Sequence, residues 1–340
     1  MHFASDNCSG VAPQIMAALL KANEGFAPGY GSDALTRRLT AQIREVFAAP
    51  EAEIALVATG TAANALALAT LTPPWSAVFS HDQAHITRDE CGAPEFFTHG
   101  AKLVPVAGAH GRMTPETLRR EIAASGNGGV HSVQRGTVSL TNVTEAGTLY
   151  SAAETAALCA VAREFGLPVH LDGSRFANAM AATGAHPADL SWRAGVDILS
   201  LGGTKNGCMG VEAVVLFDPA RAWEFQLRRK RGGHLLSKHR YLAAQLSAWL
   251  EDGLWLDLAG HANRMAARLA EGLAARPGIA QRHPVEANLM FPTWSDGTHT
   301  RLRDAGASYY AEDSDGQEGA RLVTSWSTTA DEVDRFLTFI

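Results

Sequence analysis

The sequence predicts an α/β protein built on a mainly parallel, seven-stranded sheet with helices on both faces, followed by a small C-terminal α+β domain. Seven short runs rich in Val, Ile and Leu carry no regular polar alternation, which is typical of strands buried on both faces. Helical segments separate most of these runs, and that alternation favours a parallel sheet. After about residue 250 the pattern changes to a longer helix and shorter strands.

The seven expected strands all belong to a large domain that we place at residues 1–250. They are EIALVAT (53–59), SAVFS (76–80), KLVPV (102–106), GTVSLTNV (136–143), LPVHLDG (167–173), VDILSLGG (196–203) and VEAVVLF (211–217).

The clearest helix lies between the fourth and fifth strands. Ser151 and Glu154 have the spacing of a capping box, apolar residues recur at helical intervals after them, and Gly166 ends the pattern. A second helix is expected to start with Thr114 as its N-cap and Pro115 at its first position.

Residues 251–340 are expected to form the small domain. Its elements are a helix at 256–275, short strands near 288–292 and 320–325, and a final helix from about residue 329.

The composition of the chain indicates which class of molecule it binds. The chain of 340 residues is 46% hydrophobic and 19% charged, which is enough apolar surface to order a core. Its formal charge of −6 and pI near 6.1 provide no general attraction for nucleic acid or for an anionic membrane. A small neutral or zwitterionic partner fits this balance better.

The cysteines and the first residues of the chain indicate a cytoplasmic protein. Cys8, Cys91, Cys159 and Cys208 form neither a CxxC pair nor a metal-ligand cluster with histidine, so reduced thiols and no bound metal are expected. The segment MHFASDNCSG lacks a basic region and a long apolar run. No stretch approaches the roughly 20 apolar residues that span a bilayer.

Unusual residues follow three of the expected strands. The segment ATGTAAN (58–64) comes after the first, Asp172 after the fifth, and Lys205 after the sixth. Ligands of such sheets bind outside the carboxyl ends of the strands. We therefore expect the three loops to converge on one edge of the sheet.

Each of these loops has a functional and an ordinary interpretation. Gly60 and Thr61 open a helix whose free N–H groups and dipole suit a phosphate, although an ordinary capped helix fits equally well. Asp172 could hold a protonated ring nitrogen, or cap the next helix with Arg175 as its ion-pair partner. The small residues of SLGGTKNG (200–207) could leave room for a guest at Lys205, or form a surface turn with a solvated lysine.

A phosphate cradle, an aspartate and a partly desolvated lysine together describe a holder for pyridoxal 5'-phosphate. The lysine forms a Schiff base with the aldehyde of this cofactor, and burial lowers the pKa of the amine toward its reactive neutral form. The aspartate keeps the ring nitrogen protonated, so the ring can withdraw electrons from the substrate.

The chain resembles the low-specificity L-threonine aldolases, which are fold-type I pyridoxal-phosphate enzymes within the β-eliminating lyase superfamily. The likeness runs over nearly all 340 residues. The stretches that carry it are FASDNCSG (3–10), GYGSD (29–33), ATGTAAN (58–64), AHITRDECGAPEFF (84–97), TNVTEAGT (141–148), HLDGSRFANA (170–179), LGGTKNG (201–207) and RLVTSW (321–326).

The resemblance implies a role for each matching residue. Lys205 is the expected Schiff-base lysine, Asp172 the partner of the ring nitrogen, and His85 the imidazole stacked on the ring. The remaining assignments are Gly60 and Thr61 on the cofactor phosphate, Ser5 and Arg321 on the substrate carboxylate, and Arg175 on both cofactor and substrate carboxylate.

The catalytic base is assigned to His85, with Glu90 assisting through water; the alternative for Glu90 is a carboxylate on a helix surface. Many relatives carry a histidine in an ENTHNG segment, where this chain reads TNVTEAG and has Thr144. That departure weakens any scheme that needs two histidines.

The basic stretch LRRKRGGHLLSKHR (227–240) has a solvated helix face as its simplest interpretation. In the family this region helps to build a neighbouring subunit's active site. The resemblance therefore makes Lys230, Arg231 and Lys238 candidates for contacting phosphate across an interface. It implies at least a homodimer, and a homotetramer arranged as a dimer of dimers is expected.

The implied activity is reversible cleavage of L-threonine, L-allo-threonine and phenylserine-like β-hydroxy-α-amino acids to glycine and an aldehyde. Another β-eliminating lyase or an aminotransferase on the same fold is an alternative, because the lysine, the aspartate and the phosphate loop are shared among them. A third alternative is a binding or structural protein that keeps the fold without catalysis.

Overall fold

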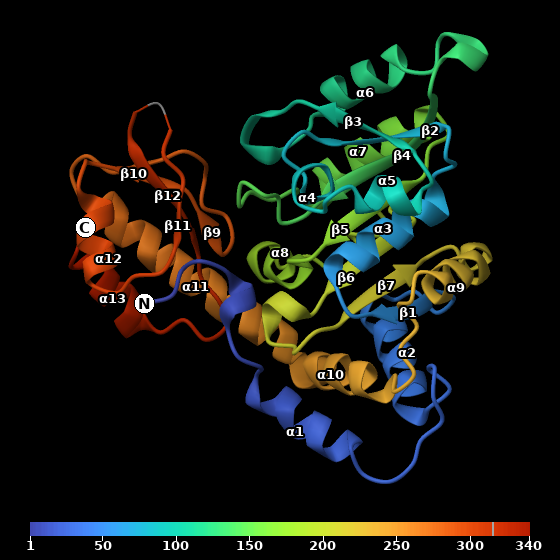
Figure 1. Cartoon of the computed structure of the whole chain (residues 1–340), viewed down its shortest axis with the longest axis horizontal. Helices are drawn as coiled ribbons and strands as arrows, with labels where there is room; N and C mark the ends of the chain where they lie inside the picture. Colours follow the sequence, from blue (N-terminus) through green and yellow to red (C-terminus); the bar gives the residue numbers. More distant parts are fainter. Residues whose placement is uncertain (315) are drawn as a thin grey trace.

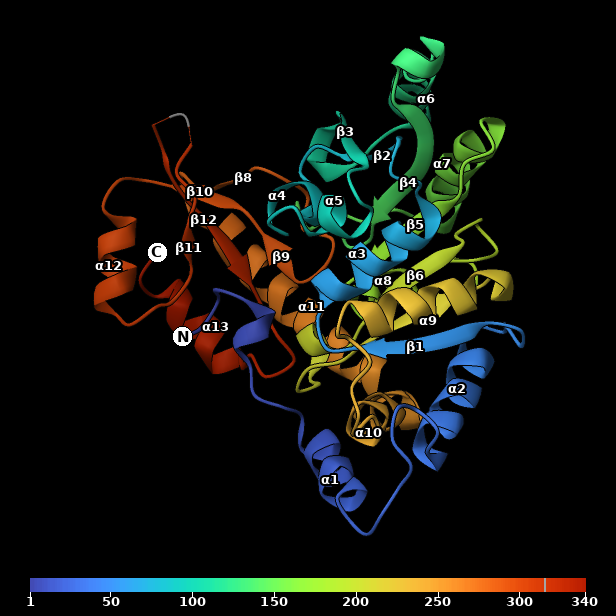
Figure 2. The same cartoon turned by 45° about the vertical axis from the view of Figure 1, so that its right-hand side comes forward.

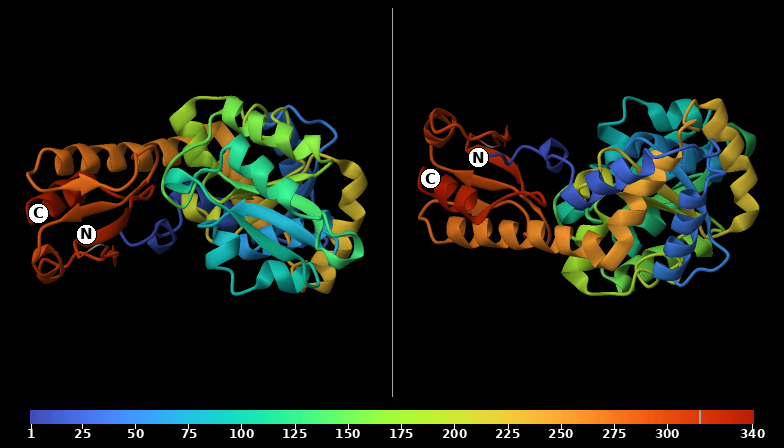
Figure 3. Two further views of the ribbon diagram at one scale, coloured as in Figure 1. Left: turned by 90° about the horizontal axis from the view of Figure 1, so that it is seen from above. Right: turned by 90° about the horizontal axis from the view of Figure 1, so that it is seen from below.

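The computed structural model describes residues 1–314 and 316–340. Figures 1 and 3 show a large lobe and a smaller one, with helix α11 (Leu254–Ala274) extending from one to the other. Both chain termini lie in the smaller lobe (Figure 3). The N-terminal segment therefore crosses between the lobes before the first helix of the large one begins.

The large lobe contains the predicted seven-stranded sheet. Its strands are β1 (Glu53–Val57), β2 (Ser76–His81), β3 (Lys102–Val106), β4 (Gln134–Thr141), β5 (Val169–Gly173), β6 (Ile198–Gly202) and β7 (Glu212–Leu216). They are ordered β1-β7-β6-β5-β4-β2-β3, and only β7 runs antiparallel to its neighbours. The prediction of a mainly parallel sheet is thus confirmed, with strand limits shifted by up to two residues.

The strand register brings the three unusual loops to one edge of the sheet. Val57 at the end of β1 and Gly202 at the end of β6 both pair with Glu212, the first residue of β7. Asp172 near the end of β5 pairs with Ser200 of β6. The carboxyl ends of β1, β5 and β6 therefore point the same way, as expected.

Helices cover both faces of the sheet. They are α1 (Pro13–Ala22), α2 (Ala34–Val46), α3 (Gly60–Leu71), α4 (His85–Arg88), α5 (Ala93–Phe97), α6 (Pro115–Ala124), α7 (Ala152–Glu164), α8 (Phe176–Thr183), α9 (Ala222–Arg231) and α10 (Arg240–Leu250). Figure 2 shows α9 on one side of β1 and α2 and α10 on the other. Alternate residues of β7 accordingly belong to two separate apolar clusters, Ala213 and Val215 to one and Val214 and Leu216 to the other.

The predicted helix starts are present. Ser151 and Glu154 form a reciprocal capping box, and Thr114 caps α6 with Pro115 at its first position. Short 3-10 helices occur before α11: η1 (Asp6–Cys8), η2 (Ala109–Gly111), η3 (Gly129–His131), η4 (Thr204–Asn206), η5 (Pro219–Arg221) and η6 (Glu251–Gly253).

The smaller lobe has an antiparallel sheet packed on helices. Its strands are β8 (Ala280–Gln281), β9 (Leu289–Met290), β10 (Pro292–Trp294), β11 (Tyr310–Ala311) and β12 (Glu318–Val323), and its helices α11, α12 (Thr298–Asp304) and α13 (Ala330–Leu337). The strands are ordered β11-β12-β10-β8, with β9 also paired to β12.

The N-terminal segment belongs physically to the smaller lobe. Phe3 is fully buried there, and its ring centroid lies 4.9 Å from that of Phe336 on α13. This contact fixes the first residues of the chain beside its last helix. The domain boundary between residues 250 and 251 remains a prediction.

Three negative findings apply to residues 1–314 and 316–340. No helix there combines the length and the apolar character that a bilayer crossing demands. The four cysteines are free. No group of three or more His, Cys, Asp or Glu residues in that part of the chain is arranged to hold a metal ion.

The end of β6 packs so closely on the end of β5 that only glycine fits. A Cβ atom at Gly202 would lie 2.4 Å from the backbone oxygen of Ser174. We expect Gly202→Ala to lower the free energy of unfolding by about 1–3 kcal/mol, because the backbone must move apart. Denaturant unfolding of the full-length chain measures this. Gly10→Ala, whose Cβ would meet nothing within 4 Å, is the control; equal losses in both variants would contradict the packing argument.

Candidate active site

A cavity of about 720 Å³ opens where the three loops converge, and residues of both lobes line it. Five of the predicted site residues belong to its wall: Ser5, His85, Arg175, Lys205 and Arg321. The others are Asn7, Gln83, Arg88, Asp89, Glu145, Ala146, Arg282, His283, Phe291, Tyr310 and Glu312. Residues more than 300 positions apart in the sequence therefore face one space.

Lys205 lies in η4, directly after β6, and is half-buried. The side chains around its loop hold the backbone in place. Glu212 accepts a hydrogen bond from Gly203 N–H at 2.8 Å, and Asn206 is bonded to both Trp249 and Trp255. The loop η4 is therefore fixed from several sides, and Lys205 lies in the wall of the cavity.

The glycines of this loop serve a different purpose from the one suggested by the sequence. A Cβ at Gly203 would approach Val211 O at 2.9 Å, and one at Gly207 would approach the Ala12 side chain at 3.2 Å. The small residues therefore let the backbone pack against the protein itself. The interpretation that they clear space for a guest is wrong for Gly202, Gly203 and Gly207.

Asp172 is 1% exposed beneath the cavity floor, at the end of β5. Its Oδ1 accepts hydrogen bonds from the backbone and hydroxyl of Ser174, and its Oδ2 accepts one from Asn64 Nδ2 at 2.9 Å. Burial opposes ionisation, but the Ser174 bonds and the charge of Lys205 outweigh it and hold the pKa of Asp172 below its usual range. A buried anion thus lies within electrostatic reach of the lysine.

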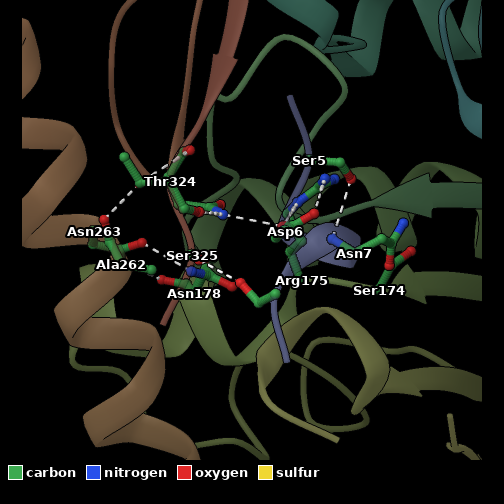
Figure 4. A network of polar contacts seen from close by, with 12 residues as sticks. Ser5, Asp6, Asn7, Ser174, Arg175, Asn178, Ala262, Asn263, Thr324 and Ser325 are labelled. Atoms are coloured by element: carbon green, nitrogen blue, oxygen red, sulfur yellow. Dashed lines mark hydrogen bonds and ion pairs between the residues drawn. The ribbon is translucent and has the colours of Figure 1, made fainter. Parts of the chain in front are cut away.

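Arg175 does not pair with Asp172, so that alternative from the sequence is wrong. Its Nε and Nη2 bind the two carboxylate oxygens of Asp6 at 2.7 and 3.0 Å, and Asn288 donates to Asp6 at 3.1 Å. Figure 4 shows this pairing between the N-terminal segment and the start of α8. Within residues 1–314 and 316–340, Nη1 of Arg175 has no hydrogen-bond partner, and the side chain borders the cavity.

Arg321 enters the same cavity from β12 of the smaller lobe. Its Nη1 donates to Ala4 O at 3.1 Å, and its guanidinium carbon lies 5.9 Å from the ring centroid of Tyr310. Burial and the charge of Arg175 lower the pKa of Arg321. Two guanidinium groups that border one cavity form a site suited to an anion. Ser5 lies beside them and accepts a hydrogen bond from Asn7 N–H.

His85 and Glu90 form a pair on the opposite side of the floor. His85 Nδ1 lies 2.8 Å from Glu90 Oε1, and this bond raises the pKa of His85 despite its burial. The Glu90 side chain is fully buried, and burial raises the pKa of its carboxyl group. The alternative of a helix-surface carboxylate is therefore wrong. Thr144 is buried and bonded to Thr148, outside the cavity wall.

Gly60 and Thr61 form the first turn of α3, next to the cavity rather than in its wall. The N-cap Thr59 accepts a hydrogen bond from Ala62 N–H at 3.1 Å, and first-turn N–H groups have no partner within a helix. A Cβ at Gly60 would meet nothing within 4 Å. Open space therefore lies against this helix terminus.

The basic residues proposed to reach a neighbouring subunit lie away from this cavity. Lys230 is exposed on α9, with its ammonium nitrogen 5.1 Å from the ring centroid of Tyr30. Arg231 borders a separate, partly apolar cavity of about 570 Å³ with Phe96 and Leu227, and Lys238 is exposed just before α10. None of the three is brought to the site within a single chain.

Several residues of the site were not predicted. Asn64 and Glu145 fall inside quoted stretches, ATGTAAN and TNVTEAG, but were given no role. Glu145 lines the cavity, and its charge raises the pKa of His85. Asp6 likewise falls inside a quoted stretch, FASDNCSG, and was given no role, whereas Arg282 and His283 carried no signal beyond their residue type. Asp6 follows Ser5 directly, whereas His283 is brought in only by the fold, where its Nδ1 lies 3.1 Å from His110 Nδ1.

Glu212, which holds the Lys205 loop, is buried, and burial raises the pKa of its carboxyl group from 4.5 to about 7. The folded state therefore keeps a proton that the unfolded chain loses, so stability falls as the pH rises from about 4.5 to about 7. We expect Glu212→Gln to remove the part of the fall in stability between these pH values that comes from Glu212. Unfolding free energies of the full-length chain at about pH 5 and pH 8 measure the difference. The exposed Glu51→Gln is the control, and an unchanged pH dependence in Glu212→Gln would contradict the assignment.

Comparison with known proteins identifies the family. Residues 2–294 match the β-eliminating lyase family. The chain is 43% identical to the low specificity L-threonine aldolase of Pseudomonas aeruginosa, over 98% of this chain and 94% of that protein. It is 41% identical to the low specificity L-threonine aldolase of a Pseudomonas species, over 96% and 93% of the two chains.

Solved structures agree with this result. A threonine aldolase of Leishmania major superposes with a TM-score of 0.94 at 30% identity, over 99% of this chain and 97% of that one. A serine palmitoyltransferase of Sphingomonas wittichii, at 16% identity and a TM-score of 0.73 over 100% and 86% of the two chains, shows the shared fold alone. The chain thus has the fold of fold-type I pyridoxal-phosphate enzymes. It belongs to the β-eliminating lyase family and, within it, to the low specificity L-threonine aldolases.

Proposed function

We propose that this chain is a pyridoxal-phosphate-dependent aldolase that cleaves L-threonine, L-allo-threonine and phenylserine-like amino acids reversibly to glycine and an aldehyde. The observation that carries the proposal is the meeting of Lys205, Asp172 and two guanidinium groups at one cavity. The names of the two Pseudomonas relatives support the same reaction.

The residues present fit the cofactor. Lys205 offers an amine in the cavity, with the buried carboxylate of Asp172 close enough for its pKa to be lowered by the lysine charge. The first turn of α3 faces open space at Gly60, where a phosphate could accept its N–H groups. When bound, pyridoxal 5'-phosphate supplies a ring that accepts electrons from the bond being broken.

In this proposal five residues of the site each hold one part of the cofactor. Lys205 binds it covalently through Nζ, and ionised Asp172 keeps the ring nitrogen protonated, because a nearby anion favours the charged form. Gly60 and Thr61 hold the phosphate through backbone N–H groups. His85 stacks on the ring. These roles rest on the geometry described above and on the resemblance of the motifs.

The substrate carboxylate is assigned to Arg321, Ser5 and the free Nη1 of Arg175. Asp6 takes the Nε–H and one Nη2–H of Arg175, so the edge formed by Nη1 and the second Nη2–H remains available for the substrate carboxylate. Binding the carboxylate in one place would hold the amino acid in one orientation toward the cofactor. Orientation then selects cleavage between Cα and Cβ.

His85 is proposed to take the proton from the β-hydroxyl group. Its Nδ1 side is occupied by Glu90, which leaves Nε2 for proton transfer. Glu90 does not line the cavity, so it acts through His85 rather than on the substrate. Assistance by Glu90 through a water molecule stays a prediction.

An oligomer is also proposed. Lys230, Arg231 and Lys238 would contact the phosphate of a neighbouring subunit in a homotetramer arranged as a dimer of dimers. Exposed apolar side chains around the same helix support an interface, since Trp223 is 73% and Phe96 74% exposed in the single chain. The cytoplasmic location remains a prediction from the sequence.

Product analysis tests the reaction. Incubation of the pyridoxal-phosphate-loaded protein with L-threonine or L-phenylserine is expected to release glycine with acetaldehyde or benzaldehyde. Lys205→Ala should lose the borohydride-trapped cofactor adduct and more than about 10³-fold of the rate, because covalent positioning is lost. Ammonia with a keto acid would instead identify a β-eliminating lyase, and a keto acid without ammonia would identify an aminotransferase. A protein that forms no borohydride-trapped adduct on Lys205 after incubation with pyridoxal 5'-phosphate, and shows no turnover, would support the non-catalytic alternative.

Arg321→Ala is expected to raise the KM for L-threonine by about 10- to 100-fold, because a charge-assisted hydrogen bond contributes roughly 1.5–3 kcal/mol. Cofactor affinity should stay within about threefold of the unsubstituted protein. Steady-state kinetics and a cofactor titration measure the two effects. Arg321→Lys keeps the charge and should recover part of the loss. Weakened cofactor binding with an unchanged KM would move Arg321 to a cofactor role.

A further inference from the structure

The side-chain amide of Asn64 lies between the two carboxylates beneath the site. Asn64 is on α3 and is 1% exposed. Its Nδ2 lies 2.9 Å from Asp172 Oδ2 and 2.9 Å from Glu90 Oε1. Both acids are themselves buried, at 1% and 4% exposed. One amide group therefore contacts the carboxylate near Lys205 and the carboxylate that holds His85.

The chemistry of the two neighbours determines how the Asn64 amide is oriented. An ionised carboxylate only accepts hydrogen bonds, and an amide nitrogen carries two N–H donors. The opposite orientation would turn Oδ1 toward two acceptors. Oδ1 instead is buried without a hydrogen-bond partner in the described part of the chain. The asparagine thus leaves its own oxygen unsatisfied so that both N–H groups can reach an acid.

This arrangement also selects the tautomer of His85. Glu90 Oε1 accepts from Asn64 and lies 2.8 Å from His85 Nδ1, so Nδ1 must carry the proton. Nε2 of the neutral ring then keeps its lone pair. Glu90 Oε2 is buried with no partner among residues 1–314 and 316–340, so Asn64 and His85 are the two donors to this carboxylate there.

We propose that Asn64 is a positioning residue that connects the acid facing the cofactor nitrogen with the Glu90–His85 pair that moves the proton. Its significance for the reaction rests on the proposed function, because the proposed aldolase reaction uses both groups. Asn64 touches neither substrate nor cofactor in this proposal; it acts through Asp172 and Glu90.

Electrostatics explain why such a connection is needed. The charge of Asp172 raises the pKa of Glu90, while the hydrogen bonds from His85 and Asn64 lower it. His85 in turn faces the negative charges of Glu90, Glu145 and Asp172. Without the Asn64 donor, Glu90 would hold its proton more strongly. His85 would then lose part of the anion that stabilises its protonated form.

The test is a titration of the His85 ring by NMR in the full-length protein, with the cofactor bound and again after its removal; His85→Asn identifies the signal. Asn64→Ala is expected to lower the pKa of His85 by about half a pH unit or more. Glu90→Gln should lower it further. In the double variant the two effects should not add, because both act on one hydrogen-bonded chain.

Asn178→Ala is the matched control. Asn178 is a buried asparagine that joins α8 to α11 through Asn263, as Figure 4 shows, and it should leave the His85 titration unchanged. If Asn64→Ala does not fold, Asn64→Ser retains one donor and should give a smaller shift in the same direction. An unchanged His85 pKa in the folded Asn64 variant, beside a lowered one in Glu90→Gln, overturns the proposal.

The titration and the product assay fail independently. A protein that releases no glycine from L-threonine can still show the expected His85 shifts, which would sink the proposed function and leave the Asn64 coupling in place. If the protein releases glycine from L-threonine but the His85 pKa is unchanged in Asn64→Ala, the proposed function stands and the Asn64 proposal is wrong.

Discussion

The buried ion pair between Asp6 and Arg175 is the contact on which the geometry of the cavity depends. Asp6 belongs to the N-terminal segment and Arg175 to the turn after β5, and the smaller lobe adds Asn288 as a further donor to Asp6. Three distant parts of the chain thus meet at one carboxylate. Removing one partner of such a pair leaves an uncompensated charge in the interior, at a cost of about 3–5 kcal/mol. The pair therefore fixes the lobes while leaving one edge of the guanidinium group free.

The floor of the cavity concentrates negative charge that the interior would normally reject. Three acids are buried here: Asp172 near the end of β5, Glu90 between α4 and α5, and Glu212 at the start of β7. Each is held by donors from the protein: Ser174 and Asn64 for Asp172, His85 and Asn64 for Glu90, and Gly203 for Glu212. The acid with the most donors, beside Lys205, has a lowered pKa, whereas the other two have raised ones. Hydrogen bonds, together with the charge of Lys205, thus offset the effect of burial on the pKa more fully at Asp172 than at Glu90 or Glu212.

Much of the fold was predictable because local signals agreed with one another. Apolar strands without alternation, capping boxes such as Ser151 with Glu154, and the change in pattern after residue 250 each follow from short-range chemistry. The meeting of the site loops at one edge was predictable as well, because a parallel sheet brings the carboxyl ends of its strands together. The role of Gly202, Gly203 and Gly207 could not be predicted from the sequence. A glycine signals that space is short, but only the folded chain shows that Ser174, Val211 and Ala12 take up that space.

The sequence by itself determined the order of the strands along the chain, the edge at which the motifs meet, and the residue types available there, because these depend on periodicity and on the handedness of strand connections. Only the tertiary structure decided the partners. Arg175 could have bonded Asp172, three residues earlier, or Asp6 near the start of the chain, and Glu90 could have faced water. A hydrogen bond between such distant residues forms only when its angle is right and its distance is correct to a fraction of an ångström. The packing of the whole molecule sets that geometry, and no local sequence pattern encodes it.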